Sequence, residues 1–165
     1  MSQDINGVRL EANPRITPEQ LFSFYEENNC CETGYGIEVA SRVLRHSSLM
    51  IGAFEGDELV GIARAMFDGV AASIMEFSLD LKHQGQERES GNGSVIVRDE
   101  SGLGKKIGEL LIKELLEMGA KFITFYIIEN CEEAFYESLG FRWNRGHLVY
   151  YIDRRPYVNW QSNAT

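Results

Sequence analysis

Ser101-Gly-Leu-Gly-Lys-Lys-Ile-Gly108 opens an amphipathic segment, and Ala134-Phe-Tyr-Glu-Ser-Leu-Gly-Phe141 follows it further along the chain. Apolar residues recur at helical spacing from Leu103 to Met118, so the first stretch predicts a glycine turn that begins a long helix. Glycines let backbone N–H groups approach an anion, and a helix N-terminus adds positive potential. The two stretches therefore predict a phosphate-binding loop and, after it, a short helix that carries Tyr136.

The glycine spacing excludes two common phosphate motifs. The Walker pattern, Gly-x4-Gly-Lys-Ser/Thr, is absent, and the dinucleotide fingerprint requires its third glycine one residue before Gly108. Gly102 and Gly104 remain as the loop glycines, and Lys105 and Lys106 beside them could add positive charge. A plain glycine turn before a helix, with no ligand, is the alternative interpretation.

In this order and near this spacing, the two stretches resemble the GNAT superfamily of acyl-CoA-dependent N-acyltransferases. Gly102 and Gly104 fill the glycines of the family pattern Gln/Arg-x-x-Gly-x-Gly/Ala, and Tyr136 fills the tyrosine that precedes a Gly-Phe strand start. The resemblance covers residues 49–153. Asp99 departs from it, because it stands at the Gln/Arg position, with Arg98 next to it. Asn130 also lies one residue closer to the tyrosine than the family asparagine.

The resemblance implies an α/β fold with a mixed, mostly antiparallel sheet of six to seven strands. About four helices flank this sheet, which is splayed between its fourth and fifth strands. The sequence itself predicts a single domain over 1–165, with a flexible loop over 82–93 because that segment lacks large apolar residues and contains three glycines. Strands are expected over 7–12, 49–54, 58–67, 72–81, 94–97, 121–128, 141–144 and 147–153. Helices are expected from Thr17 and over 38–45, 103–118 and 132–139.

The resemblance also implies acetyl-CoA as co-substrate and assigns roles to individual residues. Tyr136 takes the family role of protonating the departing CoA thiolate. The pantetheine arm is expected to pair with strand backbone, either at 77–79 or at 95–97. The residues expected to bind acetyl-CoA are Val95, Ile96, Val97, Arg98, Ser101, Gly102, Leu103, Gly104, Lys105, Lys106, Asn130 and Phe135.

We expect the base that accepts the amine proton to lie on the strand over 72–81. Strand alternation puts Met75, Phe77 and Leu79 on one face and leaves Glu76 with Asp80 on the polar face. Glu76 is therefore the predicted base, acting directly or through water, and Asp80 is the reserve candidate. A polar strand face with no catalytic role is the alternative. An acyl-cysteine route through Cys131 is set aside, since direct transfer dominates the family.

The composition of the chain indicates which kinds of partner to expect. The formal net charge of −9 argues against nucleic acid, because phosphate backbones favour Lys and Arg surfaces, and it suits a cationic amine. The three cysteines and three histidines show no disulfide framework and no metal-ligand spacing, so no metal is expected. No apolar run reaches the ~20 residues of a membrane span, and the N-terminus lacks a signal-peptide pattern, so a cytoplasmic location is expected.

The predicted function is transfer of an acetyl group from acetyl-CoA to a primary amine of a small molecule or peptide in a ternary complex. Two alternatives stay open. One is a non-catalytic acyl-CoA-binding or regulatory module on the same fold, which the Asp99 departure favours. The other is an unrelated α/β protein that binds a nucleotide such as ATP or NAD. A homodimer is also expected, since dimers are common in the family.

Overall fold

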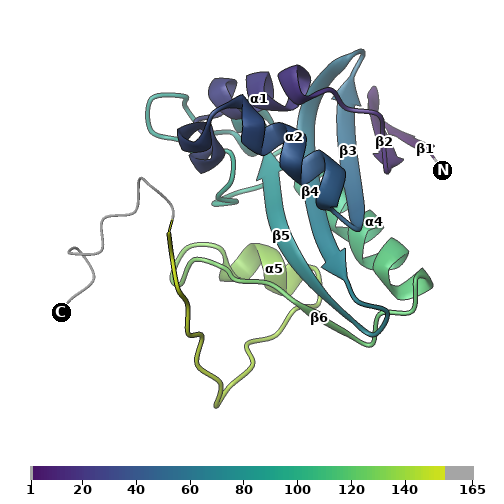
Figure 1. The fold of residues 1–165 in the computed structure, drawn as a ribbon. Coiled ribbons are helices and arrows are strands. Elements are labelled where there is room, and N and C mark those ends of the chain that lie inside the picture. Colours follow the sequence, from purple (N-terminus) through teal and green to yellow (C-terminus); the bar gives the residue numbers. More distant parts are fainter. Residues whose placement is uncertain (1, 155–165) are drawn as a thin grey trace.

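The computed structural model describes residues 2–154, except for the side chains of residues 31 and 32. A six-stranded sheet runs through it, and its strands lie side by side in chain order (Figure 1). The strands are β1 (Ser2–Ile5), β2 (Val8–Ala12), β3 (Leu49–Glu55), β4 (Glu58–Phe67), β5 (Ala71–Leu79) and β6 (Phe122–Thr124). Neighbouring strands are antiparallel except β5 and β6, which are parallel. The mixed, mostly antiparallel sheet expected from the sequence is confirmed.

The four predicted helices are present and begin within one residue of their predicted starts, whereas the short helical elements over 31–35 and 81–84 were not predicted. Thr17 caps the first helix through a hydrogen bond from the Gln20 N–H to its hydroxyl at 3.1 Å, and Pro18 fills the first helical position. The helical elements are α1 (Pro18–Glu27), the 3-10 helix η1 (Cys31–Tyr35), α2 (Ile37–His46), α3 (Leu81–Gln84), α4 (Leu103–Glu117) and α5 (Glu133–Ser138). No helix within residues 2–154 is long and apolar enough to cross a membrane.

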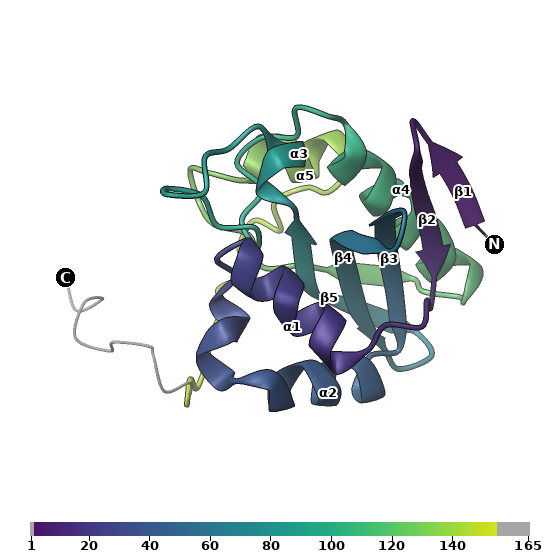
Figure 2. The ribbon, with the colours of Figure 1, turned by 90° about the horizontal axis from the view of Figure 1, so that it is seen from above.

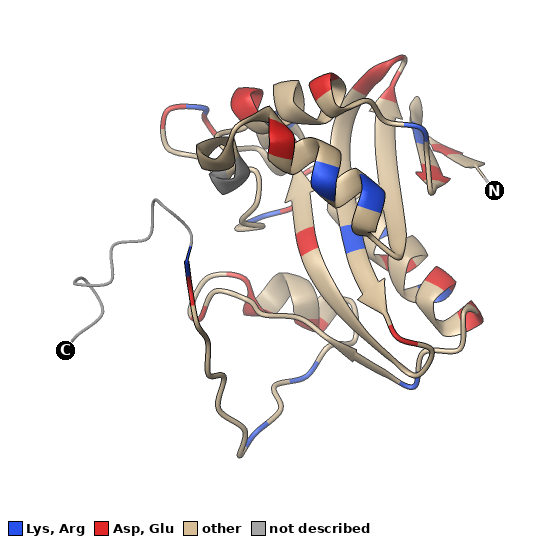
Figure 3. Ribbon diagram, in the orientation of Figure 1, with Lys and Arg blue, Asp and Glu red and all other residues tan. Residues whose placement is uncertain are grey.

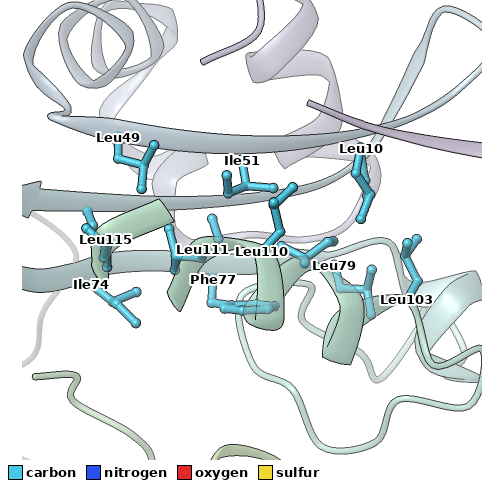
Figure 4. Packing of buried hydrophobic residues seen from close by; sticks show 14 of the residues in the cluster. Leu10, Leu49, Ile51, Ile74, Phe77, Leu79, Leu103, Leu110, Leu111 and Leu115 are labelled. Carbon is cyan, nitrogen blue, oxygen red and sulfur yellow. The ribbon is translucent and has the colours of Figure 1, made fainter. Parts of the chain in front are cut away.

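Two apolar layers enclose the sheet (Figure 2). Helices α1 and α2 cover one face, where Leu21, Phe24 and Tyr25 are buried against β4. Helix α4 covers the other face, where it packs on β2, β3 and β4, and its apolar stripe shares one core with buried side chains of β5. Figure 4 shows this second layer, in which Leu110, Leu111 and Leu115 meet side chains from the strands. Burial of the stripe fixes the start of α4 at one end of the sheet.

A β-bulge in β5 overturns the predicted alternation of side chains. Arg64 pairs with Glu76 and Ala65 with Ile74, so Met75 has no opposite residue on β4. The extra residue shifts the phase of the strand. Ile74 therefore joins Phe77 and Leu79 in the layer under α4, whereas Met75 is exposed. Assigning Met75 to the face of Phe77 was wrong, because a sequence pattern of period two does not reveal a bulge.

The sheet opens between β5 and β6. Their pairing joins Ala71–Ser73 to Phe122–Thr124, and beyond it β5 continues to Leu79 while the chain after β6 diverges (Figure 1). The predicted splay is thus present, between the strands predicted over 72–81 and 121–128. Strand β1 precedes the first predicted strand, and the segment predicted as a strand over 94–97 forms none, so the splay lies between the fifth and sixth strands of the structure.

Several predicted strands are absent or shorter. The apolar run over 121–128 forms a strand only at Phe122–Thr124, and residues 94–97 adopt bends and turns. Residues 141–144 and 147–153 are largely exposed and form no strand. A strand needs a hydrogen-bonded neighbour, and the described part of the chain presents none to these segments. The predicted loop over 82–93 contains the last residues of α3, whose Gln84 is buried and donates to the Leu79 carbonyl at 3.0 Å.

Candidate functional site

The predicted phosphate loop lies at the start of α4. Gly102 precedes the helix in the left-handed region, at φ 75°, which glycine adopts without strain. Gly104 is buried in the first turn, while the side chains of Lys105 and Lys106 are exposed. Lys106 reaches Glu109 on the next turn at 3.1 Å. The turn therefore has the backbone shape of an anion cradle, with two lysines beside it.

The N–H groups of this cradle bind the chain's own oxygens. Both oxygens of the Asp99 carboxylate accept hydrogen bonds at 2.8 Å, one from the Gly104 N–H and one from the Lys105 N–H. The Ser101 hydroxyl accepts from the Leu103 N–H at 3.2 Å. Asp99 thus caps α4 where the family pattern has a Gln or Arg. The glycines and lysines fit a pyrophosphate, whereas the carboxylate between them does not.

Glu132 bridges the two sides of the splay. Its carboxylate accepts from the Ile96 N–H at 2.7 Å, on the side of β5, and from the Ile128 N–H at 3.0 Å, on the side of β6. The residue is buried, and this burial raises the pKa of its carboxyl group against the opposing effect of the two hydrogen bonds. The backbone of predicted contact residue Ile96 is therefore already bonded, while the side chain of its neighbour Val97 is half exposed.

Tyr136 lies one helical turn after Glu132, at the inner face of the splay. Its ring makes edge contacts with Phe125, Phe135 and Phe141, with ring centroids 4.8, 4.9 and 6.2 Å away. Phe77 of β5 lies across the opening, 6.0 Å from the same ring. The hydroxyl is buried and has no hydrogen-bond partner within residues 2–154. Burial, with a smaller effect of the nearby Glu132 charge, raises the pKa of Tyr136, so this hydroxyl keeps its proton.

Glu76 lies on the opposite face of β5, in a buried polar cluster. Its carboxylate accepts from the Tyr25 hydroxyl at 2.8 Å and from the Ser78 hydroxyl at 2.9 Å. It also forms an ion pair with the Arg64 guanidinium on β4. Arg64 in turn donates to the Ser47 hydroxyl at 3.2 Å. Both carboxylate oxygens are thus occupied, an arrangement that holds β4, β5 and α1 together.

The other predicted site residues are spread around these centres. Asp80, the reserve base, caps α3 by accepting from the Lys82 and His83 N–H groups. Asn130 takes a left-handed backbone conformation in the exposed turn before α5. Arg98 is exposed beside the cradle, Val95 is partly buried, and Phe135 packs on Phe77 with ring centroids 5.5 Å apart.

Sequence reasoning missed Arg64, Tyr25 and Glu132. Arg64 is a lone cation inside an apolar strand, and buried cations require an anionic partner, so this signal was available. Glu132 precedes Tyr136 by one helical turn, which puts both on the same face. Nothing in the sequence indicates that Tyr25 bonds to Glu76 on β5, because these two residues are distant in the chain.

Comparisons with solved structures agree with the fold. The sequence matches no protein-family model and no curated protein. Solved structures do match: a probable acetyltransferase from meticillin-resistant Staphylococcus aureus, a protein of unknown function, has a TM-score of 0.68 at 16% identity, covering 88% of this chain and 98% of that one. A GNAT-family acetyltransferase from Streptococcus pneumoniae has a TM-score of 0.63 at 19% identity, covering 89% and 98%.

A third structure shows what such a fold can hold. AAC(6')-Iy, in complex with the bisubstrate analogue CoA-S-monomethyl-acetylneamine, has a TM-score of 0.62 at 9% identity, covering 89% of this chain and 98% of that one. The structural neighbours across the chain are thus GNAT-family acetyltransferases at low sequence identity. The chain has the GNAT fold.

Proposed function

We propose that this protein transfers an acetyl group from acetyl-CoA to a primary amine of a small molecule or peptide, by direct attack in a ternary complex. The observation that carries the proposal is Tyr136. A protonated hydroxyl with no partner among the described residues lies buried at the inner face of the sheet splay, on the helix that follows β6. Leaving such a hydroxyl unpaired costs free energy, so its retention suits a group that bonds to a ligand.

Each part of the proposed site has its own role in the reaction. Acetyl-CoA supplies the reactive thioester, and the turn over 101–106 is the site proposed for its pyrophosphate. Tyr136 donates its proton to the leaving sulfur, and backbone at 77–79 on β5 or in the turn segment 95–97 orients the pantetheine arm. The role of Glu76 as the base stays a prediction. Its occupied oxygens favour a positioning role, in which it fixes β5 beside the acceptor amine.

The acceptor is proposed to be cationic. Figure 3 shows acidic residues on helices at both faces of the sheet, in line with the net charge of −9. Such a field attracts positively charged ligands and raises their association rates. An amine that arrives protonated must lose its proton before attack, so activity should rise with pH until the amine is neutral.

Titration calorimetry with acetyl-CoA, CoA and ATP tests the proposal. Wild-type protein should bind acetyl-CoA, and Gly104→Glu should lose this binding because its carboxylate would face the pyrophosphate. Leu116→Glu is the matched control, since it adds the same charge at an exposed position on the same helix, ~18 Å further along. Acetyl-CoA binding should then be followed by CoA release with a panel of amines. Preference for ATP over acetyl-CoA would refute the acetyltransferase.

A second candidate function is a non-catalytic acyl-CoA-binding or regulatory module. The Asp99 carboxylate on the Gly104 and Lys105 N–H groups keeps it open, because a carboxylate there opposes the donor's phosphates and so efficient turnover, which a regulatory module does not need. This candidate predicts that Tyr136→Phe leaves the biological role intact. The acetyltransferase predicts that the same variant keeps acetyl-CoA binding and loses turnover.

We also propose that the protein forms a homodimer. Leu148, Val149, Tyr150, Tyr151 and Ile152 are each at least 60% exposed, an unusual fraction for five consecutive large apolar residues. Contact with a second copy would remove this surface from water. Sedimentation equilibrium should give a dimer for wild type and a monomer for the double variant Val149→Lys, Ile152→Lys. A wild-type monomer would refute this part.

A further inference from the structure

The first turn of α4 has no N–H group left for a ligand. A helix begins with N–H groups that lack partners inside the helix, and anions bind there for that reason. Here the Leu103 N–H is bonded to the Ser101 hydroxyl, and the Gly104 and Lys105 N–H groups are bonded to Asp99. The next N–H, of Lys106, reaches the Gly102 carbonyl at 3.4 Å.

The Asp99 side chain also fills the space that Gly104 leaves open. A Cβ placed on Gly104 would lie 3.1 Å from the carboxylate carbon of Asp99 and 3.1 Å from one of its oxygens. A glycine in a phosphate loop serves to let the anion approach the backbone. In this chain an anion of the protein itself occupies that approach.

The Asp99 carboxylate and a pyrophosphate cannot occupy this turn together, because of their charge. The carboxylate and a pyrophosphate are both negative and would use the same N–H groups at the positive end of the α4 dipole. Coulomb repulsion between like charges a few ångströms apart is substantial near a protein surface. The lysines beside the turn lie at the exposed surface, where solvent screens them.

We propose that Asp99 is an internal ligand of the phosphate cradle and sets the affinity of this protein for its acyl donor. The pyrophosphate of the donor must displace the Asp99 carboxylate from the Gly104 and Lys105 N–H groups before it binds. This inference rests on the proposed function. It assigns to Asp99 a specificity role, since a donor with a pyrophosphate meets this cost and a donor without one does not.

The test measures Kd by titration calorimetry with acetyl-CoA and with S-acetylpantetheine, which lacks the pyrophosphate. Asp99→Asn keeps an oxygen that can cap α4 and removes the charge, and Asp99→Gln installs a residue of the family pattern. Each variant should bind acetyl-CoA at least roughly tenfold more tightly than wild type, about 1.4 kcal/mol. Affinity for S-acetylpantetheine should stay the same. Thermal unfolding checks that each variant is folded.

Glu117→Gln is the control, because it removes a carboxylate charge from an exposed ion pair with Lys113 at the far end of α4. It should leave both affinities within about twofold of wild type, as expected for a surface site. Tight binding of acetyl-CoA that is equal in wild type and both Asp99 variants would overturn the inference and leave the proposed function standing. An equal gain for S-acetylpantetheine would also overturn it. No acetyl-CoA binding by wild type or any variant would overturn the proposed function itself.

Discussion

Replacing Glu76 by Gln tests whether the buried polar cluster holds the site together. Glutamine has the same shape, and its carbonyl oxygen can still accept from Tyr25 and the Arg64 guanidinium. Its amide group can donate to the Ser78 hydroxyl. The variant therefore removes the negative charge and keeps most hydrogen bonds. The Arg64 guanidinium, 10% exposed at its side chain, then loses the negative charge of its ion pair with Glu76.

The magnitude follows from that burial. Removing one partner of a buried ion pair costs about 3–5 kcal/mol, because the other charge stays uncompensated. A domain of this size is stable by roughly 5–15 kcal/mol, so the loss is a large part of the whole. At roughly 2–4 °C per kcal/mol, the unfolding midpoint should fall by roughly 6–20 °C.

Urea unfolding followed by circular dichroism measures the change. The double variant Arg64→Met, Glu76→Gln should regain most of the loss, because no buried charge is left unpaired. Glu109→Gln, at an exposed pair, should change the free energy of unfolding by less than about 0.5 kcal/mol. A Glu76→Gln variant as stable as wild type would refute the reasoning. Turnover retained by the stable double variant would exclude Glu76 as the base.

The remaining predictions concern α5 and the helix beside it. Tyr136→Phe should leave the free energy of unfolding unchanged or raise it by up to about 1 kcal/mol, since the lost hydroxyl has no partner; a loss above 2 kcal/mol in urea unfolding would contradict this. Burial raises the pKa of Glu132, so the folded protein holds this proton to higher pH than the unfolded chain. Stability due to Glu132 should therefore decrease as pH rises from the ordinary glutamate range near ~4.3 to the raised folded value. Thermal unfolding of wild type and Glu132→Gln, measured as a function of pH, checks this. A difference in stability between the two proteins that stays constant across that pH window would show that the pKa of Glu132 is not raised. Gly108→Ala should fail to give the roughly 1 kcal/mol that alanine gains in an open helix, because its Cβ would lie 2.5 Å from Leu139; stabilisation by 1 kcal/mol would refute this contact.

Local signals were enough to predict most of the fold. The Thr17-Pro18 start, the two strands predicted over 49–54 and 58–67, and the apolar stripe of α4 depend on neighbours in sequence. The GNAT-like order of elements could therefore be inferred before any contact was known. The C-terminal strands failed, because strand formation requires a partner and an apolar alternating run does not name one.

The site was predicted in part for the same reason. The glycine turn and the position of Tyr136 on a short helix follow from motif and spacing. The bulge at Met75 does not, and it moved Ile74 to the α4 side while leaving Glu76 on the α1 side. Whether a carboxylate such as Glu76 can act as a base depends on the groups that contact it in the folded protein.

The sequence by itself determined the longer helices, the glycine turn and the presence of an acid at position 99, because these are properties of single residues and their near neighbours. Only the tertiary structure decided that Asp99 binds the turn's N–H groups, that Glu132 bridges the splay, and that the Tyr136 hydroxyl has no partner among residues 2–154. Hydrogen bonding and burial depend on atoms brought together from distant parts of the chain, so the chemistry of the site was settled by packing.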